Sequence, residues 1–317
     1  MSAVPRPRRS PAPLTLAALF SKAARRLAHA KLSYGHGTLN AQDEAVCLVQ
    51  HALGLRMGSG DAAALRRPVT DAAAKKALAL IDLRIQRRVP AAYLTNEAWL
   101  QGLRFHVDER VIVPRSYIAE LLGEQFAPWL AAPNRIKTAL DLCTGSGCLA
   151  IIMAKMFPRA RIDAVDLSVA ALAVARRNVA QYRLGRRIRL VESDLFSALA
   201  DRRYDLIISN PPYVTSSTMK RLPPEYRREP ALALAGGADG FDLVDGILRR
   251  AAGHLSADGL LVVEIGHHRR RLEATYPRLP FLWPETSGGD DCVFVLSRAD
   301  LLMPAALRRR PARRRAI

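Results

Sequence analysis

From residue 136 onward the chain alternates short apolar runs with amphipathic stretches, and this alternation limits the possible folds more than any other feature. The runs that fit strands cover residues 138–142, 161–165, 188–191, 205–209, 259–265 and 292–297. Helical patterns fit between the first four runs, at 148–157 and 169–181. A strand–helix–strand series of this kind predicts an α/β fold with a parallel sheet and helices on both faces. Only a short irregular segment separates the last two runs, so we expect those two strands to pair antiparallel.

The ends of the first three predicted strands carry the residues expected around a nucleotide-like ligand. The loop 141–147 opens a helix, and its glycines let a ligand approach the backbone beside helix N–H groups. Asp166 ends the second strand, where a carboxylate can hold ribose hydroxyls. Asp194 ends the third, where it can accept from an adenine amino group while Leu195 packs on the ring. The predicted cofactor-binding residues are Asp141, Cys143, Thr144, Gly145, Ser146, Gly147, Asp166, Asp194, Leu195 and Asn210.

The fourth predicted strand ends in Asn210-Pro211-Pro212-Tyr213. Two successive prolines offer carbonyl oxygens without an N–H group, and the asparagine adds a side-chain carbonyl. Tyr213 offers a flat face on which a planar group can lie. Such a cluster suits an –NH2 group, so we predict Asn210, Pro211, Pro212 and Tyr213 as the catalytic residues. Taken by itself, the stretch could also be a strand cap followed by a proline-rich turn.

The glycine loop alone does not decide the cofactor. Residues 145–150 satisfy the G-x-G-x-x-[GA] dinucleotide fingerprint, and the spacing to Asp166 fits it as well, so NAD and S-adenosylmethionine both remain possible at this point. The fourth strand end discriminates between them, because methyl transfer to a nitrogen uses an Asn-Pro-Pro-Tyr cluster and hydride transfer does not. A third interpretation, that Gly145 and Gly147 only make a tight turn, does not explain four aligned strand ends. We therefore predict S-adenosylmethionine as the methyl donor.

The first part of the chain has a different pattern. Three helical runs lie in residues 14–88, and a hairpin turning at Gln101-Gly102 follows them. We predict a disordered basic N-terminus (1–13), a helical substrate-recognition domain (14–95), a β-hairpin joint (96–115), a methyltransferase domain (116–301) and a disordered Arg-rich tail (302–317).

The net charge of +19 is concentrated at the two ends of the chain. Seven of the 48 basic residues precede the first acid, Asp43, and six arginines follow the last acid, Asp300, which leaves 35 basic and 29 acidic residues between them. Basic ends of this kind indicate attraction to nucleic acid or a ribonucleoprotein surface. Tails that are simply solvated are the alternative.

Cysteine usage and hydropathy bound the compartment. The four cysteines show no paired metal spacing, so we predict no metal site and a reducing, cytoplasmic environment. No apolar run approaches the roughly 20 residues of a membrane span, so no membrane contact is predicted. An Arg-rich start can mimic a mitochondrial transit peptide, but the helical pattern already begins at Leu14.

These motifs resemble the class I S-adenosylmethionine-dependent methyltransferases that modify amino groups. The closer resemblance is to the protein-glutamine N-methyltransferases with an N-terminal helical domain, and it covers about residues 14–301. It is most similar to the branch that modifies a glutamine of the third large-subunit ribosomal protein, because the release-factor branch reads Pro-Arg-Pro-Glu-Thr where this chain has Pro114-Arg115-Ser116-Tyr117. The matching stretches are residues 34–37, 88–95, 107–116, 141–148, 229–237 and 287–290.

The resemblance implies a Rossmann-like, mostly parallel seven-stranded sheet with an antiparallel last strand. It implies methyl transfer from S-adenosylmethionine to a glutamine side-chain amide of that ribosomal protein, free or in the assembling large subunit. The alternatives are a release-factor glutamine, an exocyclic amino group of a nucleic-acid base, and a non-catalytic ribosome-assembly factor. The chain departs from the family pattern with Tyr117 for Pro, Arg228 for His, His267 for Asn, and Gly289-Asp290-Asp291-Cys292 for Gly-Asp-Gly.

Overall fold

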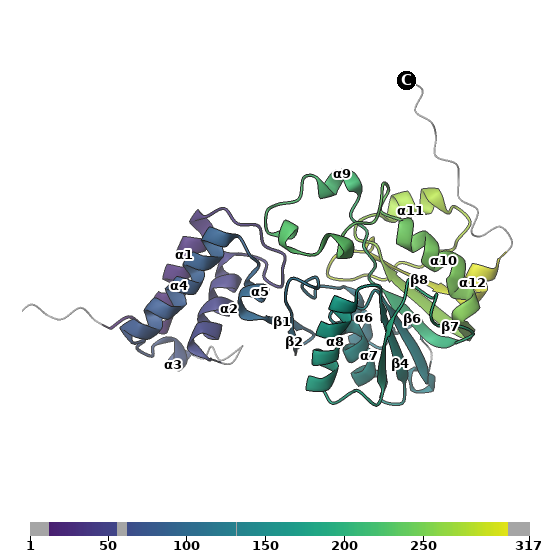
Figure 1. The fold of residues 1–317 in the computed structure, drawn as a ribbon, viewed down its shortest axis with the longest axis horizontal. Helices are drawn as coiled ribbons and strands as arrows, with labels where there is room; N and C mark the ends of the chain where they lie inside the picture. The colour runs from purple at the N-terminus through teal and green to yellow at the C-terminus, as the bar shows by residue number, and fades with distance from the viewer. Residues whose placement is uncertain (1–12, 56–61, 131, 304–317) are drawn as a thin grey trace, which may run out of the picture. The chain divides into compact units, whose positions relative to one another are not determined.

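The computed structural model describes residues 13–55, 62–130 and 132–303, and these fall into two units, Met1–Thr95 and Asn96–Ile317 (Figure 1). Nearly all of the N-terminal stretch predicted to be disordered, and the arginines of the predicted tail, lie outside the described residues.

The first unit is helical, as the sequence predicts. Its helices are α1 (Leu16–His29), α2 (Ala41–Leu53), α3 (Ala62–Leu65), α4 (Asp71–Arg87) and α5 (Ala91–Thr95). Thr15, Asn40 and Thr70 cap the starts of α1, α2 and α4 through side-chain oxygens. The apolar faces of these three helices form one core, and a buried ion pair between Arg84 and Glu44 (2.8 Å) joins α4 to α2.

The second unit begins with the predicted hairpin, in which β1 (Glu97–Leu100) pairs antiparallel with β2 (Leu103–His106). Gln101 and Gly102 both have positive φ (49° and 69°), which is the pattern of a type I′ turn. A short helix, α6 (Ile118–Gly123), follows.

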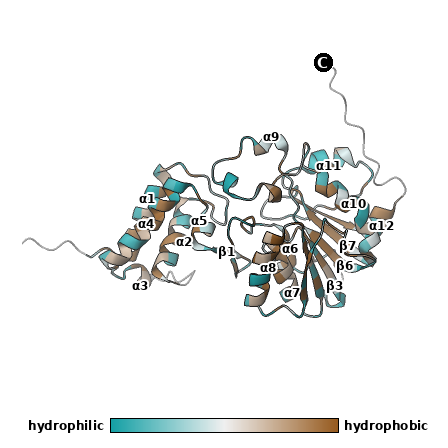
Figure 2. Cartoon of the chain, viewed as in Figure 1, coloured by the Kyte–Doolittle hydropathy of each residue, from teal (hydrophilic) through white to brown (hydrophobic). Residues whose placement is uncertain are grey.

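A six-stranded sheet forms the centre of the second unit, in the order β5-β4-β3-β6-β7-β8. The strands are β3 (Thr138–Leu142), β4 (Arg161–Asp166), β5 (Ile188–Glu192), β6 (Tyr204–Ser209), β7 (Leu255–Glu264) and β8 (Val293–Ser297). All neighbours are parallel except β7 and β8, which confirms the predicted antiparallel last strand. The strands are coloured hydrophobic in Figure 2, as expected for a sheet that is covered on both faces.

Helices cover this sheet (Figure 1). They are α7 (Cys148–Met156), α8 (Val169–Gln181), α10 (Asp242–His254), α11 (Arg269–Thr275) and α12 (Arg298–Leu302), with the short α9 (Ser216–Met219) and the 3-10 turns Pro133–Arg135, Tyr226–Arg228 and Ala231–Ala233 in the connections. α7 and α8 stand where the sequence predicts them. α11 corrects the expectation of an irregular segment between the last two strands. No helix among the described residues is long and apolar enough to cross a membrane.

The seventh strand that the family resemblance implies is reduced to a single bridge. Leu282 exchanges two backbone hydrogen bonds with Val295 of β8, and no ladder extends beyond them among the described residues. Pro280 and Pro284 bracket this position, and neither has an N–H group to donate. The sheet therefore has six strands in the described chain, with one paired residue at its β8 edge.

The strand order reverses at β3, which has β4 on one side and β6 on the other. The chain runs outward from β3 through β4 to β5, and then returns to the other side of β3 with β6. In open parallel sheets a ligand binds outside the carboxyl ends of the strands at such a switch point. The ends of β3, β4, β5 and β6 are the positions from which the sequence predicts the site.

Candidate active site

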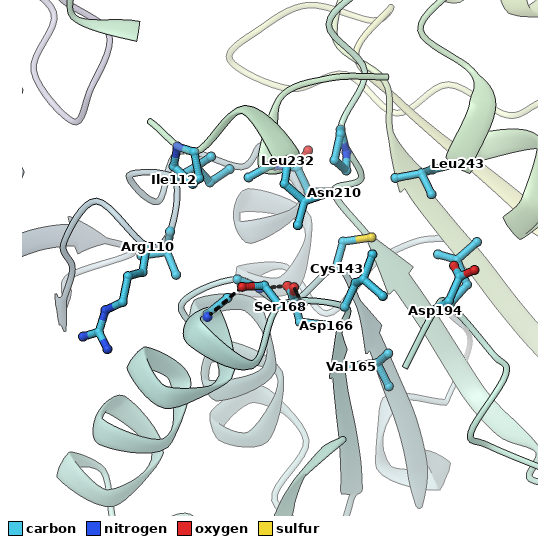
Figure 3. A pocket seen from close by; sticks show the side chains of 18 of the residues that line it. Arg110, Ile112, Cys143, Val165, Asp166, Ser168, Asp194, Asn210, Leu232 and Leu243 are labelled. Carbon is cyan, nitrogen blue, oxygen red and sulfur yellow. Dashed lines mark hydrogen bonds between the residues drawn. The ribbon is translucent and has the colours of Figure 1, made fainter. Parts of the chain in front are cut away.

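A pocket lies at the carboxyl ends of β3 to β6, and Figure 3 shows the side chains around it. Asn210 and Leu232 lie on one side and Cys143 and Asp166 on the opposite side, with Asp194 toward one end. Its wall comprises Arg110, Val111, Ile112, Cys143, Gly145, Val165, Asp166, Leu167, Ser168, Ala171, Ser193, Asp194, Leu195, Asn210, Pro212, Pro230, Leu232, Ala233 and Leu243.

Seven of the predicted site residues belong to this wall: Cys143, Gly145, Asp166, Asp194, Leu195, Asn210 and Pro212. The structure thus brings together residues from four strand ends. Six others lie one or two positions from wall residues in the chain but outside the wall itself: Asp141, Thr144, Ser146, Gly147, Pro211 and Tyr213. Their contacts show what these six do in the fold.

Asp141 holds the glycine loop from behind. Its Oδ2 accepts hydrogen bonds from the Thr144 hydroxyl (2.6 Å) and from the Ala150 N–H at the start of α7 (3.0 Å). Burial raises the pKa of Asp141 to about 7, although these two hydrogen bonds act in the opposite direction. The other oxygen, Oδ1, is buried and has no hydrogen-bond partner among the described residues. An unpaired acceptor of this kind suits an ammonium group or an ordered water molecule.

Asp166 stands at the end of β4, and its carboxylate accepts a backbone hydrogen bond at each oxygen. Its two oxygens accept from the N–H groups of Gly145 (2.8 Å) and Ser168 (2.9 Å). A carboxylate has about four lone-pair sites, so each oxygen can accept once more from a hydroxyl on the pocket side. Burial raises the pKa of Asp166, against the effect of the backbone hydrogen bonds.

The loop backbone is open where a ligand would approach. A Cβ atom placed on Gly145 would meet no atom within 4 Å, and Gly145 has a φ of +56°, which disfavours a side chain there. At Gly147 a Cβ atom would lie 3.2 Å from the Cβ of Ala175, so this glycine allows α7 and α8 to pack closely. Gly145 therefore serves the pocket, whereas Gly147 serves the packing behind it.

The end of the pocket at Asp194 combines one carboxylate with apolar side chains. Val165, Leu195 and Leu243 belong to the same hydrophobic cluster and also to the pocket wall. A carboxylate next to an aliphatic wall matches a flat ring that carries an amino group. Together with the open Gly145 backbone and the free acceptors of Asp166, this end fits the ring, ribose and chain of S-adenosylmethionine.

The backbone of the Asn-Pro-Pro-Tyr stretch is enclosed by glycines. A Cβ atom on Gly236 would lie 2.6 Å from the Cα atom of Tyr213, and one on Gly240 would lie 2.6 Å from its carbonyl oxygen. On the other side, a Cβ atom on Gly266 would lie 2.9 Å from the tyrosine ring. Any side chain at these three positions would push Tyr213 away, so the glycines fix the place of the stretch.

Glu264, at the end of β7, is a site residue that the sequence reasoning missed. It is 1% exposed, and its Oε2 accepts from the Ser116 hydroxyl (2.6 Å) and the Tyr117 N–H (2.9 Å). Its Oε1 accepts from the Tyr213 hydroxyl at 3.4 Å. Burial raises the pKa of Glu264 to about 7. A lone acid inside an apolar strand run is the sequence signal that could have identified it.

A second missed contact joins residues 113–115 to the loop that follows β6. Both oxygens of Glu229 accept from the Arg115 guanidinium at 2.6 Å, and Oε1 also accepts from the Val113 N–H at 2.9 Å. The Glu229 side chain is fully buried. Pro230, the next residue, lines the pocket, so the ion pair holds one wall in place.

Asn178 was also missed, although an asparagine inside a helix is a recognisable signal. It is fully buried in α8 and donates from its amide to the carbonyl oxygens of Ser146 (2.9 Å) and His106 (3.0 Å). Its Oδ1 accepts from the His106 N–H at 2.8 Å. One side chain thus joins the glycine loop to the hairpin.

Known proteins provide an independent comparison. Residues 123–222 match the methyltransferase small domain family. The chain is 54% identical to the ribosomal protein uL3 glutamine methyltransferase of Bordetella pertussis, over 90% of this chain and 96% of that protein. It is 51% identical to the protein of the same name from Neisseria meningitidis serogroup B, over 91% and 94%. Among solved structures, a methyltransferase from Pyrococcus furiosus aligns with a TM-score of 0.45 and 19% identity, over 63% and 90%.

Proposed function

Because this chain belongs to the family of ribosomal protein uL3 glutamine methyltransferases, we propose that it methylates the side-chain amide nitrogen of a glutamine in that ribosomal protein. The observation that carries the proposal is the position of Asn210 in the same pocket wall as Cys143, Gly145, Asp166 and Asp194. In this proposal the residues that hold the amide lie beside the residues that hold the methyl donor.

The proposed binding residues follow from the wall and its support. S-adenosylmethionine, when bound, supplies a methyl group on a positively charged sulfur. Asp166 would hold the ribose hydroxyls, Asp194 the adenine amino group, and Leu195 the face of the ring. Cys143 and Gly145 would lie along the chain of the cofactor. Asp141, Thr144, Ser146 and Gly147 would support this loop from behind, with Oδ1 of Asp141 free to accept.

The chemical task of Asn210 and Pro211 follows from the weakness of the nucleophile. An amide nitrogen attacks poorly because its lone pair is delocalised into the carbonyl. We propose that the two N–H bonds of the glutamine are held by the Asn210 side-chain oxygen and the Pro211 carbonyl, which aims the lone pair along an in-line path. Positive charge that develops on the nitrogen then meets two dipoles that are already oriented. Pro212 and Tyr213 would confine the plane of the amide.

The Asn210 side-chain oxygen and the Pro211 carbonyl must be held in fixed positions, and in this proposal Glu264 helps to hold them. Its hydrogen bonds to Ser116, Tyr117 and Tyr213 connect the catalytic stretch with the segment before α6. The Arg115–Glu229 ion pair connects the same segment with the loop 214–239, which we propose closes over the glutamine. Both are positioning groups that act through the residues that they hold.

None of the described residues of the helical unit lines the pocket, and we assign substrate recognition to this unit. The basic ends of the chain, most of which lie outside the described residues, would add non-specific contact with ribosomal RNA. Since ribosomal proteins are synthesised and assembled in the cytoplasm, we place the enzyme there. The free ribosomal protein and the assembling large subunit would both present the glutamine.

The test is methyl transfer from labelled S-adenosylmethionine to large-subunit ribosomal protein and RNA from cells lacking the enzyme, with the two fractions separated. We expect label on one glutamine of the uL3 protein, located by mass spectrometry. Label in the RNA fraction, or on another protein alone, would overturn the proposed substrate.

The role of Asn210 is tested by Asn210→Ala and Asn210→Asp, with Asn134→Ala as a control at an exposed asparagine. Losing one oriented acceptor should lower single-turnover methylation about 10²–10³-fold. Asn210→Asp keeps an acceptor oxygen but loses the amide N–H2, so it should bind the cofactor and also transfer slowly. A mere strand cap would instead lower the melting temperature and leave turnover per folded molecule unchanged. Near-normal turnover of Asn210→Ala would end this mechanism.

A further inference from the structure

His267, Asp291 and Cys292 come together next to the catalytic stretch, although the sequence spacing gave no sign of it. His267 follows β7, and the other two residues precede β8. The His267 Nδ1 atom lies 2.9 Å from Oδ1 of Asp291 and 3.5 Å from Sγ of Cys292, and that sulfur lies 3.4 Å from the same oxygen. Among the residues that the structure describes, this is the one group of three metal-ligating side chains with mutually close ligand atoms. We call it the His–Asp–Cys cluster.

We propose that the His–Asp–Cys cluster binds a zinc-type divalent cation with three protein ligands and one open position. Tetrahedral zinc lies about 2.0 Å from nitrogen and oxygen ligands and about 2.3 Å from sulfur. These lengths separate a nitrogen and an oxygen ligand by about 3.3 Å, and either one from a sulfur by about 3.5 Å. The separations in the cluster, 2.9, 3.5 and 3.4 Å, need a shift of a few tenths of an ångström at most.

The ligand chemistry selects the kind of metal. Imidazole, carboxylate and thiolate together suit zinc or cobalt, whereas magnesium and calcium take oxygen ligands. The thiol must lose its proton when the metal binds. Metal binding therefore releases a proton from sulfur, and the cation takes over the charge that Asp291 brings to the cluster.

The surroundings leave access from the solvent side. The side chains of His267 and Asp291 are 67% and 37% exposed, whereas Cys292 is buried, so the open position faces water. Three arginines, Arg269, Arg270 and Arg271, line the same surface pocket as His267 and Asp291. Arg269 is paired with Asp290 (2.8 Å) and Glu273 (3.1 Å), so its charge is compensated locally, whereas Asp291 and the thiolate would supply the negative charge that the cation meets.

The cluster also lies where ligation would tighten the fold. The Ile265 N–H donates to the Cys292 carbonyl at 2.8 Å, so the two ligand-bearing segments already run together. Gly266, between Ile265 and His267, packs on the Tyr213 ring.

The experiment is a titration of the reduced full-length protein with Co²⁺, followed by the thiolate-to-cobalt charge-transfer absorption, and a competition with Zn²⁺. We expect one Co²⁺ per chain, displaced by Zn²⁺, and a melting temperature that rises with Zn²⁺. Cys292→Ser should abolish the charge-transfer band. Asp291→Asn and His267→Asn should weaken metal binding at least tenfold. Cys47→Ser replaces a cysteine of the helical unit that forms no disulfide, and it should leave the metal titration unchanged.

Two results would overturn the proposal. One is the absence of a charge-transfer band in the parent protein. The other is a band of the same strength in Cys292→Ser, which would place the metal on another cysteine. Because Cys292 is buried, Cys292→Ser could lose the fold, and His267→Asn at an exposed position then decides. If folded His267→Asn binds Zn²⁺ with unchanged affinity, His267 is not a ligand and the proposed site is wrong.

Discussion

Arg115→Met should destabilise the second unit far more than the loss of an ordinary surface arginine. Arg115 donates two hydrogen bonds of 2.6 Å to Glu229, whose side chain is fully buried, while Arg115 itself is 24% exposed. Removing one partner of a buried ion pair leaves a charge without its counterion and costs about 3–5 kcal/mol. Because the arginine is partly exposed and water can replace it, we expect the lower end, about 3 kcal/mol.

Glu229→Gln should cost less, because the amide keeps the size of the side chain and an acceptor for the Val113 N–H. Loss of a charged hydrogen bond suggests about 1.5–3 kcal/mol. In the double variant Arg115→Met with Glu229→Gln, no unpaired carboxylate remains. The two effects should therefore not add, with a coupling energy of about 1–3 kcal/mol. Arg110→Met is the matched control, since the Arg110 side chain is 45% exposed and its ion pair with Asp108 should be worth only about 0–1 kcal/mol.

Urea unfolding followed by tryptophan fluorescence measures this directly. All three tryptophans, Trp99, Trp129 and Trp283, lie in the second unit, so the signal reports that unit without the helical one. The reasoning would be refuted if Arg115→Met lowered the free energy of unfolding by no more than Arg110→Met does. So would strict additivity of the single variants, because a buried pair must show coupling.

Two further predictions concern the carboxylates. Asp166→Ala removes two acceptors of charge-assisted hydrogen bonds, each worth about 1.5–3 kcal/mol. Calorimetry on the folded variant should therefore show S-adenosylmethionine binding at least tenfold more weakly. An affinity equal to that of the parent would exclude Asp166 from the site. Burial raises the pKa of Glu264 from its ordinary value of 4.5 to about 7 in the folded state. Between these two pH values the native state therefore holds a proton that the unfolded chain has released. Stability from Glu264 is therefore lost as pH rises from about 4.5 to about 7, and Glu264→Gln should gain about 3 kcal/mol relative to the parent over this range in the same unfolding assay. If Glu264→Gln and the parent differ by the same free energy of unfolding at pH about 4.5 and about 7, the raised pKa of Glu264 is contradicted.

The site residues at the strand ends could be predicted because the sequence signal for each lies within a few neighbouring positions. Apolar runs mark β3 to β6, and the residue after each run faces the edge where parallel strands end together. Asp166, Asp194 and Asn210 therefore share one pocket for reasons that the order of elements already contains. The hairpin at Gln101-Gly102 is equally local, because its turn requires positive φ at both positions.

The remaining site residues depend on contacts that sequence distance hides. Glu264 meets Ser116 across 148 positions, and Glu229 meets Arg115 across 114. Neither acid has a local signature that names its partner. The β8 edge shows a related difficulty, because Pro280 and Pro284 reduce an expected strand to one bridge at Leu282, and this follows from backbone donors and not from hydropathy.

These contacts explain why a weak nucleophile could react in this site. Two acceptors can aim an amide lone pair only if they keep their positions to within a fraction of an ångström, because misplacement of reacting groups is costly. The stretch that carries them contains two prolines, which cannot donate to a sheet ladder, so its backing must come from outside the strand. Gly236, Gly240 and Gly266 enclose Tyr213, and Glu264 accepts from its hydroxyl. In the mechanism that we propose, the rigidity of Asn210 and Pro211 therefore rests on three glycines and one buried acid that lie outside the pocket wall.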